Sequence, residues 1–78
     1  MDEHTLLAKL EASAEKLEGV VERFLDARDA FSALVEEGNP DRRQRKLARD
    51  RLLDRAIDIE SAATEIEQLM RQDRDSAD

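Results

Sequence analysis

Six basic side chains that could bind an anion lie within residues 41–51 of an otherwise acidic chain. They are Arg42, Arg43, Arg45, Lys46, Arg49 and Arg51, and only two carboxylates, Asp41 and Asp50, accompany them. The stretch therefore carries a charge of +4, whereas the chain as a whole carries −7. Arg and Lys make most contacts to nucleic-acid phosphates, and they also pair with acidic protein segments. The sequence therefore offers a possible anion or acidic-partner patch formed by Arg42, Arg45, Lys46 and Arg49.

Side chains that could support catalysis or hold a metal are otherwise poorly arranged. The one histidine, His4, stands near the start, there is no cysteine, and Gly19 and Gly38 form no phosphate-binding loop. Carboxylates do recur at helical spacing, but without the organising loop that a calcium site needs. They are Glu11, Glu15, Glu18, Glu22, Asp26 and Asp29 in the first half, and Asp50, Asp54 and Asp58 in the second. We expect no enzyme activity, no small-molecule substrate, no cofactor and no metal site, and we interpret the carboxylates as solvated faces.

The elements that position these side chains are two long helices. Apolar residues recur at steps of three and four, which is the helical period. In the first helix, heptad position a holds Leu10, Leu17, Phe24 and Phe31, and position d holds Leu6, Ser13, Val20, Ala27 and Leu34. In the second helix the predicted seam, meaning the row that packs on the other helix, is Leu52, Ala56, Ile59, Ala63, Ile66 and Met70.

A short stop, turn and restart signal separates the helices. Gly38 suits the left-handed residue that follows a helix, Asn39 suits an N-cap, and Pro40 suits the first position of the next helix. Asp41 then falls in the first turn, where the helix dipole favours a carboxylate. A turn this short makes the helices antiparallel, with residue i facing roughly residue 78 − i.

The sequence thus predicts an all-α, antiparallel, coiled-coil-like hairpin in residues 1–72. Its first helix covers about 3–37, its turn 38–40, its second helix about 40–72, and residues 73–78 form a disordered tail. At 78 residues the chain is one domain at most. It shows no basic and apolar leader pattern and no apolar run near the roughly 20 residues of a membrane span. We expect a cytoplasmic protein with no membrane partner.

Each predicted helix has a wider apolar arc than one partner helix can cover. The arc spans about 180°, whereas a two-helix contact needs a narrower stripe. We therefore expect a homodimer, assembling as a four-helix bundle, or binding to another helical protein. The predicted interaction face is Leu10, Leu17, Val20, Val21, Phe24, Phe31, Leu34, Leu52, Ala56, Ile59, Ala63, Ile66 and Met70.

The basic run has four interpretations. Continuing the second seam backward from Leu52 places Arg49, Arg45 and Arg42 on the inner face, opposite Asp29, Glu36 and Glu37, so internal ion pairing is one of them. In an antiparallel dimer the run could also reach acidic residues of the second copy. The remaining interpretations are binding of an acidic protein segment and binding of nucleic acid. Nucleic acid is possible but disfavoured, because the rest of the chain is acidic and no aromatic residue stands near the run for base stacking.

The sequence predicts a small non-catalytic protein-interaction module: an adaptor, a regulator or a chaperone-like subunit. The alternative is a nucleic-acid-associated regulator that uses the run 42–51. In addition, "LLAKLE", the Gly and Pro turn and "RAIDIESAATEIEQL" together resemble the short hairpin co-chaperones of type III secretion systems. That resemblance implies a hairpin that holds a sticky secretion subunit. The outline is also similar to that of small dimeric bundle regulators.

Overall fold

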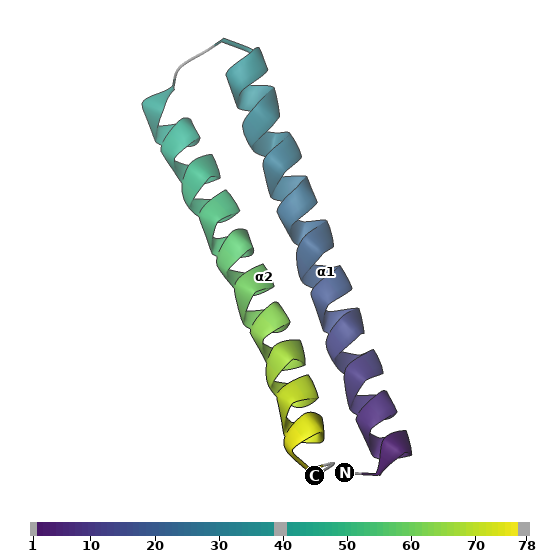
Figure 1. Ribbon diagram of the computed structural model, residues 1–78. Coiled ribbons are helices and arrows are strands. Elements are labelled where there is room, and N and C mark those ends of the chain that lie inside the picture. The colour runs from purple at the N-terminus through teal and green to yellow at the C-terminus, as the bar shows by residue number, and fades with distance from the viewer. Residues whose placement is uncertain (1, 39–40, 77–78) are drawn as a thin grey trace.

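Two long helices account for the structure, a computed structural model that describes residues 2–38 and 41–76 (Figure 1). Helix α1 (Glu3–Glu36) and helix α2 (Arg42–Ser76) lie side by side and antiparallel, so the start of α1 lies beside the end of α2. The hairpin is a rod of 58 × 16 × 13 Å. No strand occurs in the described residues. The predicted all-α antiparallel hairpin is therefore confirmed.

The turn begins as the sequence predicts. Gly38 has a φ of 65°, the left-handed conformation that costs glycine least. Its N–H donates to the carbonyl of Val35 at 3.2 Å, and the N–H of Glu37 donates to the carbonyl of Ala33 at 3.0 Å. Two carbonyls of the last turn of α1 thus gain partners as the helix ends.

The start of α2 differs from the prediction. Asn39 and Pro40, the expected N-cap and first helical residue, lie outside the described residues. Asp41 is the capping residue, because its carboxylate accepts the N–H of Arg43 at 3.0 Å and its carbonyl accepts the N–H of Arg45 at 3.0 Å. Helix α2 therefore starts at Arg42 rather than near residue 40.

The end of α2 lies four residues beyond the predicted end at 72. Residues 73–76 of the predicted disordered tail are helical, and residues 77–78 lie outside the described part. Two features favour this extra turn. Arg71 pairs with Glu67 one turn earlier at 2.5 Å, and Arg74 stands in the last turn, where the helix dipole favours a cation.

The core is a single narrow seam between the helices. Within the described residues the buried apolar side chains are those of Val20, Ala27, Ala62 and Leu69. On α1 the remaining predicted a and d positions are half-buried, which confirms the predicted register of this helix. No large side chain is fully buried in the described part of the chain. The hairpin therefore buries little apolar surface by itself.

The seam of α2 follows a different row from the predicted one. It runs through Ala48, Leu52, Arg55, Ile59, Ala62, Ile66 and Leu69. Ala62 is 1% exposed and Leu69 8%, whereas Ala63 is exposed and Met70 is 38% exposed. Leu52, Ile59 and Ile66 belong to both rows. Ala63 and Met70 stand directly beside the buried Ala62 and Leu69, so apolar spacing alone did not separate the two rows at these positions. The observed row also contains Arg55, a charged residue that a search for apolar spacing does not select.

An ion pair fixes the antiparallel alignment of the helices. Lys16 Nζ lies 2.8 Å from Glu65 Oε1 across the hairpin. The predicted relation places Lys16 opposite residue 62, which is within one helical turn of Glu65. Both side chains are about half exposed, so the pair contributes at most about 1 kcal/mol. It marks the alignment more than it stabilises the fold.

Substitution of the two glycines by alanine should have opposite effects on stability. A Cβ on Gly19 would have only Arg23 Nη2 as a close neighbour, at an ordinary 3.7 Å, so Gly19→Ala should stabilise the protein by about 1 kcal/mol through helix propensity. Gly38→Ala should destabilise it by about 1 kcal/mol, because alanine is strained at positive φ. Urea unfolding followed by circular dichroism measures both. A loss of stability in Gly19→Ala would contradict the open surroundings of this glycine.

Candidate interaction surface

The hairpin has two faces that differ in polarity, one on each side of the seam. The polar face holds the Lys16–Glu65 ion pair, and it consists of two rows that repeat every seven residues. These rows are Lys9, Lys16, Arg23 and Ala30 on α1, and Arg51, Asp58, Glu65 and Gln72 on α2. Two grooves confirm that the rows adjoin, because Lys9 and Gln72 line one groove and Arg23 and Arg51 line the other.

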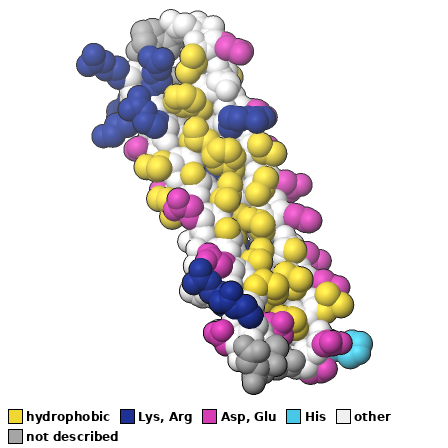
Figure 2. All heavy atoms as spheres, in the orientation of Figure 1, with side chains coloured by type: hydrophobic (Ala, Val, Ile, Leu, Met, Phe, Trp, Pro, Cys, Tyr) yellow, Lys and Arg dark blue, Asp and Glu magenta, His cyan; other side chains and the backbone are white. Residues whose placement is uncertain are grey.

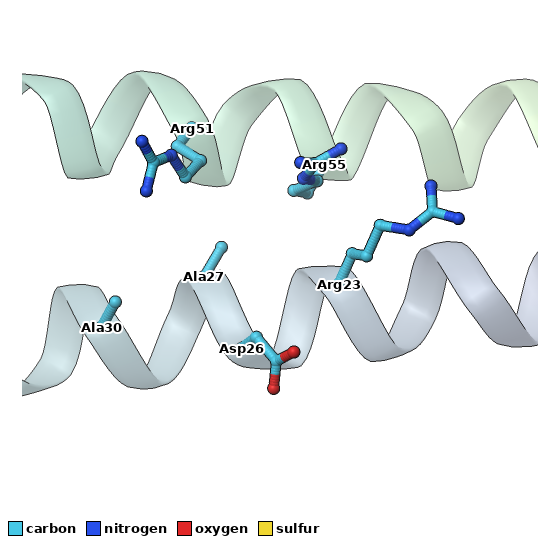
Figure 3. Close-up of a pocket in the computed structure, with 6 residues that line it drawn as sticks. All are labelled: Arg23, Asp26, Ala27, Ala30, Arg51 and Arg55. Atoms are coloured by element: carbon cyan, nitrogen blue, oxygen red, sulfur yellow. The ribbon is translucent and has the colours of Figure 1, made fainter.

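The groove near the turn is cationic. It has a volume of about 220 Å³ and is lined by Arg23, Asp26, Ala27, Ala30, Arg51 and Arg55. Figure 3 shows Arg51 and Arg55 extending from α2 beside Arg23 of α1, while Asp26 points away from α2. Arg55 is paired with Asp58 at 3.5 Å. The groove is open and shallow, and among residues 2–38 and 41–76 no cluster of acidic or histidine side chains is arranged to hold a metal ion.

The opposite side of the seam is the apolar face. Its members are exposed or half-exposed apolar residues on both helices: Leu7, Ala14, Val21, Leu25 and Val35 of α1, and Leu53, Ala56, Ala63 and Met70 of α2. Figure 2 shows a continuous band of hydrophobic side chains along the hairpin, bordered by acidic side chains and by basic ones near the turn. Exposed apolar side chains this contiguous usually mark a binding surface.

The total exposed surface is large for a chain of this mass. The folded chain exposes 6247 Å². A compact monomer of 8.9 kDa exposes about 4,800 Å², so the hairpin exposes roughly 1,400 Å² more. A standard protein interface removes about 800 Å² from each partner. The excess is thus large enough to supply one interface.

The thirteen residues of the predicted interaction face divide between the seam and the apolar face. Nine lie in the seam, where the other helix already covers them in part: Leu10, Leu17, Val20, Phe24, Phe31, Leu34, Leu52, Ile59 and Ile66. Val21, Ala56, Ala63 and Met70 lie on the apolar face. Sequence reasoning did not single out Leu7, Leu25, Val35 or Leu53, four of its most exposed apolar members. Leu7 and Val35 stand at seven-residue spacing in one row with Val21, and that spacing was the available signal.

The basic run is exposed rather than internally paired. Arg42, Arg43, Arg45, Lys46, Arg49 and Arg51 are all exposed, and within the described ranges no ion pair joins any of them to α1. The predicted pairing of the run with Asp29, Glu36 and Glu37 is therefore wrong. Asp29 instead pairs with its neighbour Arg28 at 3.2 Å. The seam passes Ala48 rather than Arg49, so Arg49 points away from the position that the pairing required.

The fold defines the chain as an all-α two-helix hairpin. Neither helix, within the residues described, combines the length and apolar character that crossing a membrane requires. Comparison with protein-family models, with curated proteins and with solved structures finds no match for the chain. The resemblance to secretion co-chaperones thus stays a prediction, and the function must be argued from the surface itself.

Ala62 and Ala63 provide a direct test of the α2 register. Ala62→Leu should destabilise the hairpin by about 1–3 kcal/mol, because the added atoms must fit a closed seam. Ala63→Leu adds the same atoms on the exposed apolar face and should leave the hairpin at least as stable. Thermal unfolding of the two variants measures this. If Ala63→Leu were the more destabilising change, the predicted seam through Ala63 would be correct instead.

Proposed function

We propose that the chain is a small, non-catalytic protein-interaction module of the adaptor, regulator or chaperone-like kind, working in the cytoplasm. The observation that carries the proposal is the apolar face, which is contiguous along both helices and exposed. Burying such a face removes apolar area from water at about 25 cal/mol per Å². A protein surface of matching shape and polarity is therefore the natural ligand.

The module acts by presenting two helices that are already aligned. The seam and the turn hold the helices together, so a partner meets a preformed surface and little ordering is needed on binding. A helical partner packs its own apolar stripes against this surface, and two partner helices complete a four-helix bundle. The polar face, with its Lys16–Glu65 pair, then remains in contact with water.

The character of the rest of the surface supports a non-catalytic role. The grooves on the polar face are open and shallow, at about 220 and 380 Å³, and exposed arginine, lysine and glutamine side chains form much of their lining. The described residues include no buried polar or charged side chain. Catalytic groups usually stand in a concave, partly desolvated pocket that shifts their pKa values, and a two-helix rod provides little of this kind.

Two leucines of equal exposure on different faces test the proposal. Leu53, 58% exposed, belongs to the apolar face, whereas Leu47, 61% exposed, lies outside it on α2. A photoreactive amino acid at position 53 should crosslink to a polypeptide in cells, and the same group at position 47 should crosslink little. Mass spectrometry of the adducts measures this. Equal crosslinking from both positions, or none from position 53, would contradict the proposal.

Binding of nucleic acid is a second candidate, favoured by the exposed basic run that no α1 carboxylate neutralises. Arg and Lys at the turn end would contact phosphates, and the affinity would fall steeply as salt rises. The acidic remainder of the chain opposes this role, because a duplex would be repelled along most of the rod.

Salt-dependent binding of a labelled duplex and a labelled single strand tests the second candidate. If the run binds phosphates, affinity at low salt should fall at least roughly tenfold when Arg42, Arg45 and Arg49 become Ala. The same triple change at Arg23, Arg71 and Arg74 is the matched control and should have a smaller effect. Absence of binding by the unmodified protein at low salt would exclude this candidate.

A further inference from the structure

We propose that a second copy of this chain covers the apolar face, oriented so that the turn of each copy lies beside the chain ends of the other. This inference rests on the proposed function, because it names the occupant of the same apolar face. It follows from how charges are distributed along that face, from its area and from the symmetry that a pair of identical surfaces must obey.

Charges that border the apolar face separate by sign along the rod. The half near the turn has four cations and no anion in the rows beside the seam: Arg28, Arg42, Lys46 and Arg49. The half near the chain ends has four anions in the equivalent rows, Glu11, Glu18, Glu60 and Glu67, with Arg74 as their one opposing cation. In Figure 2 basic side chains gather at the turn end, and a second group of basic side chains lies on α2 nearer the chain ends.

Identical faces can meet around a two-fold axis in two orientations. With the axis along the rod, the turns meet, so the basic halves face each other and the acidic halves face each other. With the axis across the rod, each turn meets the chain ends of the other copy, and opposite charges face each other. Like charges brought together at an interface repel each other, so the second orientation is favoured.

The helix bounds place specific charges at the same level in this orientation. In this orientation α1 of one copy lies over α1 of the other copy and runs in the opposite direction. Because the two helices are reversed about the midpoint of Glu3–Glu36, Arg28 of one copy lies level with Glu11 of the other. Each α2 is reversed about the midpoint of Arg42–Ser76, which brings Arg49 within two residues of Glu67. Both alignments place a cation of one copy beside an anion of the other, twice per dimer.

Arg28 and Glu67 already form ion pairs within one chain, but these pairs do not prevent them from joining the interface. Arg28 contacts Asp29 at 3.2 Å and Glu67 contacts Arg71 at 2.5 Å, but all four side chains are more than half exposed. Exposed pairs of this kind contribute little to stability. They are therefore weak enough to rearrange when the two faces meet.

The area of the face matches what a stable dimer requires. The rod is 58 Å long and 16 Å wide, so one face covers about 900 Å², close to the roughly 800 Å² that each partner contributes to a standard interface. The excess exposed surface of the single hairpin is of the same order. A second copy is therefore sufficient to cover the face from end to end.

Charge reversal combined with light scattering tests the pairing. The unmodified protein should have twice the 8.9 kDa mass of the chain across a dilution series. Arg28→Glu with Arg49→Glu should weaken dimerisation by at least roughly tenfold, and adding Glu11→Lys with Glu67→Lys should restore it, because the opposed charges are then exchanged. Arg43→Glu with Arg51→Glu makes the same charge change off the face and is the control. Circular dichroism verifies that every variant is helical.

A spin label measures the orientation directly. The chain lacks cysteine, so Ser32→Cys, at an exposed position near the turn, provides one attachment site. The proposed orientation separates the two labels by about 25 residues along the helix, or about 40 Å at 1.5 Å per residue. Turn-to-turn pairing would place them roughly 10–20 Å apart.

Three results would overturn the inference: a helical monomer at every concentration, a short label distance, or failure of the fourfold reversal to restore the dimer. Failure of the proposed function gives a different result. If position 53 crosslinks to another protein while the purified chain is monomeric, the face is an interaction surface but its occupant is not a second copy. If position 53 crosslinks to nothing, both proposals fail together.

Discussion

Contact between only two helices limits what this chain can bury, and most of its structure depends on that constraint. A helix in a pair covers one narrow stripe of its neighbour, so the seam receives about one side chain in three or four. The consequence is visible in the short set of buried apolar residues, Val20, Ala27, Ala62 and Leu69, three of which are small or medium in size. Apolar residues beside the seam, such as Val35 and Met70, remain exposed in the hairpin.

The same constraint explains why the two sides of the seam differ. On one side, flanking positions hold lysine, arginine, aspartate and glutamate, and the Lys16–Glu65 pair joins the helices. On the other, the flanking positions hold leucine, valine, alanine and methionine. A hairpin that functioned alone in water would gain solubility from polar flanks on both sides. The asymmetry therefore gives the rod one apolar face and one polar face.

Much of the fold could be predicted from the sequence, because its strongest signals are local. Gly38 specifies a left-handed residue by itself, and the heptads of α1 contain large residues at almost every a position. The register of α2 was harder, because Ala62 and Ala63, and likewise Leu69 and Met70, are nearly equivalent in an apolar pattern. The choice depended on Arg55, whose stem can pack in a seam while its charged end reaches Asp58, and no spacing rule identifies such a residue. The pairing of the basic run failed for a related reason: it assumed a register that places Arg49 in the seam.

The position of the turn also determines where the rod opens first. The turn joins the helices covalently at one end, whereas at the other end only seam contacts hold the start of α1 beside the end of α2. Local opening costs least free energy where few buried apolar contacts hold the backbone, so the hairpin should open from its free end. Amide hydrogens should accordingly exchange fastest near that end and more slowly toward the middle of the seam.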